Sequence, residues 1–330
     1  MENMIDTLIF SMNAVLPLIM LVILGYILRQ KNVFTDDFLK TANKFCFRFC
    51  FFSTMFISIY NLSAFDSVYR DLALFSLCSI LALIVVGIVY ALLFVKDDRQ
   101  KGVMAQAFYR SNYAIIGVPL VANLFGESGT ASAAVVLAST VPVFNITAVI
   151  LLNIWIKDSG KKVSPLNMLK KIAMNPLLEG IAAGALCCLV RPYLHGWTLK
   201  DGEIKFIYKT IENLSKITTP LALIILGGQF KFSAASSRVH QIIVAVIFRL
   251  LIAPLLGLSA AYLLFPSFTP REYAALIPLF ASPVAVASAI MAREMKNDGD
   301  LATQILVWST LFSSFTVFLV IAVLRTVGLL

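Results

Sequence analysis

Residues 110–120 read RSNYAIIGVPL, an apolar stretch that carries Gly117 and Pro119. Proline lacks a backbone N–H and clashes with the preceding helical turn, so it interrupts the hydrogen-bond ladder. Residues 280–288 read FASPVAVAS and place Pro283 inside a second apolar stretch in the same way. Backbone groups freed in lipid are costly unless they meet protein partners or line a cavity. The two stretches therefore predict a pair of interrupted helices inside a membrane.

Composition indicates that a bilayer is the solvent of the whole chain. Of the 330 residues, 59% are hydrophobic and 14% are charged, and the mean hydropathy is +0.88. Soluble domains average about 45–50% apolar and about 25% charged residues. A net charge of +9 would suggest nucleic acid as the partner of a soluble protein, but basic cytoplasmic loops explain it here. We therefore expect membrane lipids, and no nucleic acid, as partners.

Ten apolar windows predict ten transmembrane helices. Each window is about 20 residues long, enough to cross roughly 30 Å of hydrocarbon. They cover residues 7–28, 39–61, 72–95, 103–125, 130–156, 172–195, 206–229, 238–265, 271–293 and 301–328.

The longest predicted inner loop divides these windows into two sets of five. Because five is odd, the second set must insert upside down relative to the first, as in inverted-repeat transporters. The predicted fold is an all-α polytopic membrane protein with ten transmembrane helices in two inverted five-helix repeats, in which helices 4 and 9 are broken and cross. The repeats cover residues 1–156 and 175–330. Residues 157–174 form a cytoplasmic linker with a short amphipathic helix.

Lysine and arginine positions orient these helices, because cytoplasmic loops of membrane proteins are enriched in both residues. With both termini outside, fifteen such residues fall on the inner side and seven on the outer side. The inner set is Arg29, Lys31, Lys40, Lys96, Arg99, Lys101, Lys157, Lys161, Lys162, Lys170, Lys171, Lys231, Arg238, Arg293 and Lys296. We therefore predict a multi-pass protein of the cytoplasmic membrane with both termini outside.

The two interrupted helices are the predicted substrate site. Interruptions at matching positions of two repeats indicate a site near the middle of the membrane, although proline kinks are also common in ordinary membrane helices. Half-helix N-termini expose backbone N–H groups that favour an anion. Asn112 and Asn145 add amide donors, and Ser282 lies beside Pro283. Asn145 is equally suited to a plain hydrogen bond between helices.

Cations inside the predicted spans are the second set of candidates. Lys44, Arg48, Arg110 and Arg249 lie within apolar windows, where charges are costly and usually functional unless they reach the interface. We select Arg110 and Arg48 as the residues that attract an anionic substrate. A further pair, Glu212 and Lys216, has the spacing of a mutual ion pair on one helix face.

Several chemical classes have no support in the sequence. The chain has two histidines, outside any HExxH motif, and no Walker A loop, so we predict no enzymatic activity, no metal and no cofactor. A channel filter of the TVGYG kind is also missing. Transport would then draw on gradients or be passive.

Several stretches together resemble the auxin efflux carrier family, in its bacterial branch of malate and malonate permeases. They are residues 108–119, 175–176, 219–228, 281–287, 291–294, 300–304 and 309–310. The resemblance covers nearly the whole chain. It implies a fold similar to sodium/proton antiporters and bile-acid transporters, with spans four and nine crossing at their prolines. It also implies a scaffold, a mobile transport unit, elevator-type alternating access, carboxylate binding near the crossing, and homodimers.

The chain departs from that family in its second span. The family usually has a proline midway through this span, paired with the position of Pro220 in span seven. Here residues 49–55 read FCFFSTM, without proline. Ser53 is the residue that could replace it as a polar contact.

The sequence thus predicts a secondary transporter or facilitator of small mono- or dicarboxylates. Arg110 and Arg48 steer the anion, Asn112 holds it, and Gly117, Pro119, Ser282 and Pro283 keep the crossing open. Two alternatives stay open: a membrane sensor or scaffold that does not transport, and a cation antiporter, which would be expected to carry mid-membrane aspartates. Substrate identity, direction and coupling ion are not determined by these residues.

Overall fold

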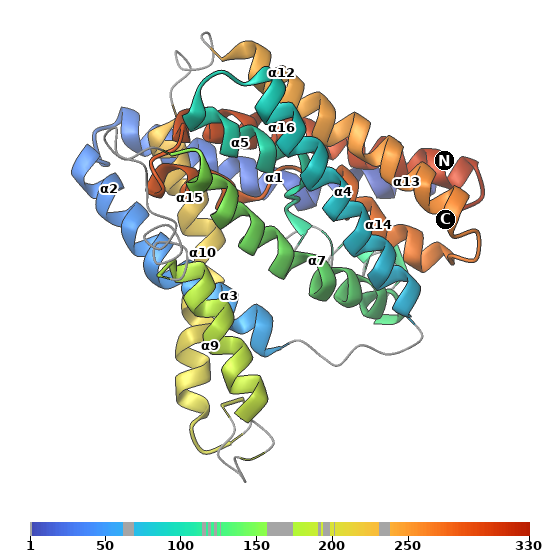
Figure 1. The fold of residues 1–330 in the computed structure, drawn as a ribbon, viewed down its shortest axis with the longest axis horizontal. Helices are drawn as coiled ribbons and strands as arrows, with labels where there is room; N and C mark the ends of the chain where they lie inside the picture. Colours follow the sequence, from blue (N-terminus) through green and yellow to red (C-terminus); the bar gives the residue numbers. More distant parts are fainter. Residues whose placement is uncertain are drawn as a thin grey trace.

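A computed structural model describes residues 2–61, 69–113, 117, 120–121, 124–125, 127–156, 174–190, 193, 199–200, 202–230 and 238–330. The described residues are helical, apart from short connections and one isolated antiparallel bridge between Ser111 and Val284. The predicted amphipathic helix of the linker, at residues 157–173, and Pro119 lie outside the described residues. Figure 1 shows the arrangement of the helices.

Each predicted span contains at least one helix of the structure. In the first half these are α1 (Glu2–Gln30), α2 (Asp36–Phe45), α3 (Phe51–Tyr60), α4 (Arg70–Phe94), α5 (Asp98–Tyr109) and α7 (Glu127–Ile154). In the second half they are α9 (Pro176–Val190), α10 (Lys205–Gln229), α12 (Val239–Ile247), α13 (Ala253–Leu264), α14 (Pro270–Ala281), α15 (Val286–Glu294) and α16 (Gly299–Thr326).

Two of the predicted spans contain a π-helical turn instead of a regular α-helix throughout. Residues Cys46–Cys50 join α2 to α3, and residues Phe248–Ile252 join α12 to α13. A π-turn inserts one extra residue without ending the helix, and such turns are frequent at functional sites. Residues 36–60 and 239–264 are therefore continuous helices with a local change in the direction of their side chains.

Four helices among the described residues are long and apolar enough to cross a membrane. They are Arg70–Phe94, Ala131–Ile154, Val239–Leu264 and Gly299–Thr326. Two shorter apolar helices, Leu16–Gln30 and Pro176–Val190, accompany them. Several helices begin with a side-chain cap at the polar connections, which satisfies N–H groups that the helix leaves free. Thr269 and Glu272 form a complete capping box at α14, and Asp298 caps α16.

The helices pack into two groups. The first, here called the crossing unit, consists of α4, α5, α7 and α12–α16. The second, the companion unit, consists of α1, α2, α3, α9 and α10, of which α3, α9 and α10 project away from the rest in Figure 1. Helix α1 lies between the groups, because it packs against both α10 and α16.

Small residues allow the closest helix contact in the companion unit. A Cβ atom added to Gly25 of α1 would lie 2.0 Å from the Ile224 carbonyl oxygen of α10. A Cβ added to Gly227 of α10 would lie 2.0 Å from the Val22 carbonyl oxygen of α1. Backbones that approach this closely gain dispersion contacts, the main attraction between helices in lipid. The two glycines therefore fix how closely α1 and α10 pack.

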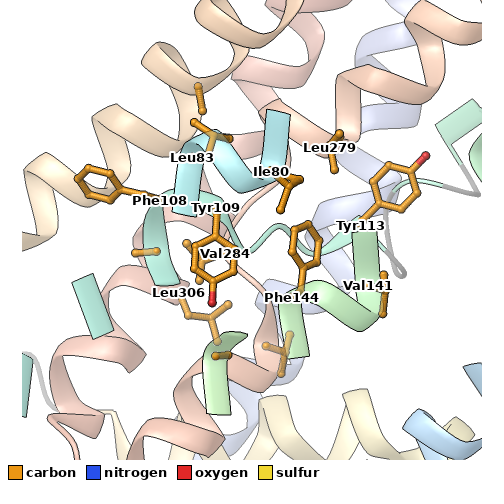
Figure 2. Packing of buried hydrophobic residues seen from close by; sticks show 14 of the residues in the cluster. Ile80, Leu83, Phe108, Tyr109, Tyr113, Val141, Phe144, Leu279, Val284 and Leu306 are labelled. Atoms are coloured by element: carbon orange, nitrogen blue, oxygen red, sulfur yellow. The ribbon is translucent and has the colours of Figure 1, made fainter. Parts of the chain in front are cut away.

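The core of the crossing unit surrounds the interruptions of its helices. Figure 2 shows Tyr109 of α5, Phe144 of α7 and Leu306 of α16 close together, with Leu279 of α14 to one side and Phe108 of α5 pointing to the other. All five side chains are buried. The interruptions therefore lie inside a closely packed apolar core and not at the surface of the bundle.

Candidate functional site

Two helices of the crossing unit are interrupted inside this core. Helix α5 ends at Tyr109, and the next residue, Arg110, is extended, with φ −84° and ψ 92°. Helix α14 ends at Ala281, and Ser282 is extended, with φ −75° and ψ 158°. The second interruption has a local cause, because a proline restricts the preceding residue to extended backbone and Pro283 follows Ser282.

The two extended segments cross and pair with each other. The Asn112 N–H donates to the Pro283 carbonyl at 2.8 Å, and the Ala285 N–H donates to the Arg110 carbonyl at 3.1 Å. Buried backbone groups without a partner are costly in lipid, so each interruption supplies the partners that the other needs. We call this pair of segments, residues 110–112 and 282–285, the crossing.

The first interruption that the structure describes lies before the residues predicted to cause it. Helix α5 ends at Tyr109 and Arg110 is extended, seven residues before Gly117, which is itself buried and helical. A Cβ at Gly117 would meet the ring of Tyr113 at 2.8 Å, which assigns this glycine to packing against that ring. No proline stands at residues 110–112; the crossing segment of the other helix, not the local sequence, places this break.

A third buried donor at the crossing is satisfied from α16. The Val284 N–H donates to the Ser309 hydroxyl at 3.2 Å, and that hydroxyl donates to the Leu306 carbonyl at 3.1 Å. Helix α16 therefore supports the crossing with a polar side chain as well as with apolar contacts.

Arg249, in the π-turn between α12 and α13, binds the carbonyl ends of both interrupted helices. Its Nε donates to the Ser282 carbonyl at 2.9 Å, and its Nη2 donates to the Leu279 carbonyl at 2.5 Å. Its Nη1 donates to the carbonyls of Phe108 and Tyr109, each at 3.4 Å. The side chain is fully buried. The sequence marked Arg249 as a candidate because it is an arginine inside an apolar window. The contacts of its side chain could not be inferred from the sequence.

Arg110 is a second buried cation at the crossing. Its Nη2 donates to Asn145 Oδ1 at 2.6 Å, and its Nη1 contacts Gln106 Oε1 at 3.2 Å and Met291 Sδ at 3.0 Å. These acceptors are neutral. Among the described residues, neither Arg110 nor Arg249 is paired with a carboxylate. Buried charges usually have counter-charges, so the crossing carries excess positive charge.

Several polar groups around the crossing are buried without a partner within the described residues. They are Ser111 Oγ, Asn112 Nδ2, Ser282 Oγ and Ser288 Oγ. The first two N–H groups of α15, at Val286 and Ala287, also have no acceptor in the described part of the chain. Each unsatisfied buried group costs about 1–3 kcal/mol. Their number at one place indicates a position for a ligand that accepts hydrogen bonds.

The candidates of the second span lie apart from this cluster. Arg48 is in the π-turn Cys46–Cys50 with an exposed side chain, and Ser53 is buried on α3. Span two has no proline to interrupt its regular α-helix, but this π-turn does interrupt it. The Thr218 hydroxyl of α10 donates to the Cys50 carbonyl at 3.0 Å, so spans two and seven are joined by a polar contact two residues before Pro220.

Polar contacts also join the helices at the end of α15. The Asn43 Nδ2 of α2 donates to Glu294 Oε1 of α15, which links the companion unit to the crossing unit. Asp298 accepts from Arg238 Nε at 2.8 Å and from Gln100 Nε2 at 2.9 Å. Burial raises the pKa of the Asp298 carboxyl, but these bonds and one from the Leu301 N–H outweigh it, so its pKa lies below the ordinary 3.8.

Two further points concern ions. The predicted pair of Glu212 and Lys216 is confirmed, with an N–O distance of 3.2 Å. The described residues contain no group of three or more histidine, cysteine, aspartate or glutamate side chains placed to hold a metal ion.

A helical bundle with two interrupted helices that meet in its core, lined by buried donors, has the arrangement of a transporter's substrate site. The class defined by this arrangement is a multi-pass membrane transporter. The chain belongs to the membrane transport protein family, the auxin efflux carrier family, whose model matches residues 10–321. The resemblance inferred from the sequence is thereby confirmed.

Two archaeal relatives agree with this assignment. An uncharacterized transporter of Methanothermobacter thermautotrophicus is 26% identical over 307 residues, which cover 92% of this chain and 95% of the relative. An uncharacterized transporter of Methanocaldococcus jannaschii is 27% identical over 248 residues, which cover 74% of this chain and 76% of the relative. Neither name states a substrate.

Proposed function

We propose that the chain is a secondary transporter or facilitator that moves small organic acid anions, mono- or dicarboxylates, across the cytoplasmic membrane. The observation that carries this proposal is the chemistry of the crossing. It combines a buried guanidinium, at Arg110, with several hydrogen-bond donors, and the described residues supply neither a counter-ion for the first nor acceptors for the second. A carboxylate supplies both the missing negative charge and the missing acceptors.

Each residue of the proposed site has a distinct role. Asn112 Nδ2 and the serine hydroxyls donate to the carboxylate, together with the free N–H groups that open α15. Arg110 supplies positive charge, and Asn145 holds its guanidinium in place. Pro283 keeps the second helix open, and Gly117 and Pro119 are assigned the same role on the first.

Arg48 and Ser53 have a different place in the proposal. The exposed side chain of Arg48 attracts the anion before it reaches the crossing, and Ser53 lines its route along the companion unit. Asn43 and Glu294 join the two units at the end of α15. Their contact must break if the units move relative to each other.

The architecture proposed for this activity is a ten-helix bundle of two inverted repeats, residues 1–156 and 175–330, joined by the linker 157–174. The helix packing supports a division of labour: the crossing unit carries the substrate, and the companion unit serves as the scaffold in an elevator-type exchange. The excess of inner lysine and arginine supports both termini outside. A homodimer formed through the scaffold fits this arrangement.

The chemistry of the described acids argues against a cation antiporter. Among the described residues, Asp298 is the only buried acid. It is the N-cap of α16 and is bonded to Arg238. A cation site at the crossing would need a carboxylate there. A sensor or scaffold that does not transport is separated from the proposal only by measuring flux.

The test is uptake of labelled malate, malonate and indole acetate into proteoliposomes that contain the purified protein. We expect uptake of at least one of these carboxylates above that of empty vesicles, and a loss of about tenfold or more in Asn112→Ala. The matched control is Asn153→Ala, because the Asn153 side chain of α7 donates to the Val149 carbonyl of its own helix. Uptake equal to empty vesicles for all three probes would refute transport of these anions, and equal rates for Asn112→Ala and Asn153→Ala would refute the site.

A further inference from the structure

The crossing brings together helix ends of opposite polarity. Within the described residues, α5 and α14 end there with their carbonyls, and α15 begins there with its N–H groups. An N-terminus acts as roughly +0.5 of an elementary charge and a C-terminus as roughly −0.5. Two C-terminal ends and one N-terminal end sum to about −0.5. The backbone of these helices therefore gives the crossing no preference for anions.

Arg249 changes this balance. Its guanidinium lies against the carbonyl ends of both α5 and α14, with bonds to Phe108, Tyr109, Leu279 and Ser282. Two C-terminal ends carry about one negative charge together, and one guanidinium carries one positive charge. The charge of the carbonyl ends is cancelled, and that of the α15 N-terminus is left over.

The position of Arg249 suits this role, because its guanidinium faces backbone carbonyls. Four carbonyls in the described residues occupy its Nε, Nη1 and Nη2 atoms, and the side chain is fully buried. Arg110 differs, because its acceptors are side chains and a sulfur atom. The two arginines therefore have separate tasks, one toward the helix backbone and one toward the site.

We propose that Arg249 is a specificity-determining residue: by neutralising the carbonyl ends of both interrupted helices, it makes the crossing selective for anions over neutral molecules of the same shape. The proposal rests on the proposed function, because it assigns the origin of charge selectivity at that same site. A purely structural role, in which Arg249 only holds the helices together, would lower the amount of active protein without changing its selectivity.

The test compares malonate with malonamide, its neutral isostere, as competitors of labelled malonate uptake in proteoliposomes. The measured quantity is the ratio of the half-inhibitory concentrations of malonamide and malonate. This ratio is independent of how much of the protein is folded. We expect the ratio to fall at least tenfold, about 1.4 kcal/mol, in Arg249→Met, which keeps the length and loses the charge. The control, Lys209→Met, removes a charge from the exposed surface of α10 and should leave the ratio unchanged.

Arg249→Lys gives an independent answer, including the case in which the methionine variant does not fold. Lysine retains the charge but cannot reach all four carbonyls with the planar fork of arginine. We expect a lower maximal rate and a selectivity ratio within about threefold of the wild type. An unchanged ratio in Arg249→Met, or a tenfold loss in Arg249→Lys, would overturn the proposal. If the wild type takes up no malonate, labelled malate replaces it as the tracer and malate diamide replaces malonamide as the competitor. Absence of uptake of both tracers by the wild type would count against the proposed function instead.

Discussion

The contact between α1 and α10 offers a direct test of the packing of the companion unit. Gly25→Ala would place a Cβ atom 2.0 Å from the Ile224 carbonyl oxygen, whereas real Cβ atoms essentially never come within 3.0 Å of another heavy atom. The clash is with backbone, so no side chain can rotate away from it. The two helices must separate by about 1 Å at this point.

The size of the effect follows from two opposing terms. Alanine is favoured over glycine inside a helix by about 1 kcal/mol, which would stabilise the variant. A gap of about 0.5–1 Å forfeits roughly a quarter to a half of each dispersion contact it opens, and overpacking of this kind costs about 1–3 kcal/mol or more. We expect a net loss of about 2 kcal/mol. At about 2–4 °C per kcal/mol, the melting temperature falls by about 4–8 °C.

The measurement is thermal unfolding of the purified protein in detergent, followed by size-exclusion chromatography of heated samples. The matched control variant is Leu24→Ala, on the same turn of α1, where the side chain is 43% exposed. We expect a much smaller change in its melting temperature. Gly227→Ala should behave like Gly25→Ala, and the double variant should lose less than the sum, because both changes separate the same helices. A melting temperature at or above that of the wild type, as helix propensity alone would give, would refute the packing argument.

The remaining predictions concern polar contacts. Ser309→Ala leaves the Val284 N–H without its acceptor and should lower the free energy of unfolding by about 1–3 kcal/mol, whereas Ser314→Ala on the exposed face of α16 should not; equal melting curves would contradict this. Because the folded pKa of Asp298 is lowered, its ion pair stabilises the protein above the ordinary pKa and is lost as the pH falls through the folded value. The melting temperature of Asp298→Asn should therefore lie below that of the wild type at pH 7 and approach it as the pH falls below 3.8; a constant difference would contradict the assignment. Glu294→Ala removes the contact with Asn43 and should alter the rate of carboxylate uptake with little change in affinity; a change in affinity alone would argue against a role in movement.

The candidate residues differ in where the structure places them. Asn112, Asn145, Arg110, Ser282 and Pro283 were selected from the sequence, and the structure brings all five to the crossing or into contact with its residues. Their residue types carried the information, because polar residues in an apolar window are costly without a task. Arg48 was selected for the same reason but has an exposed side chain, since a charge in a window does not reveal which way its helix face points.

The irregularities of the helices divide in the same way. The π-turn Cys46–Cys50 stands where the family places a proline, and no residue type in it would have predicted an extra residue in the turn. Its carbonyl at Cys50 is satisfied by Thr218 from another helix. Contacts of this kind join positions far apart in the chain, so hydropathy and local propensity do not contain them.

The sequence by itself indicated that this protein belongs in a membrane, roughly where its helices run, and that a helix is interrupted near Pro283. The first two conclusions follow from the free energy of transferring side chains into lipid, and the third follows from the steric effect of one proline. Both effects depend on residues close together in the sequence. Only the tertiary structure decided that the first break lies at Arg110 and not at Gly117, and that Arg249 binds both carbonyl ends. The physical reason is that a broken helix in lipid must find partners for its backbone. Here those partners are the other broken helix and an arginine more than a hundred residues away in sequence.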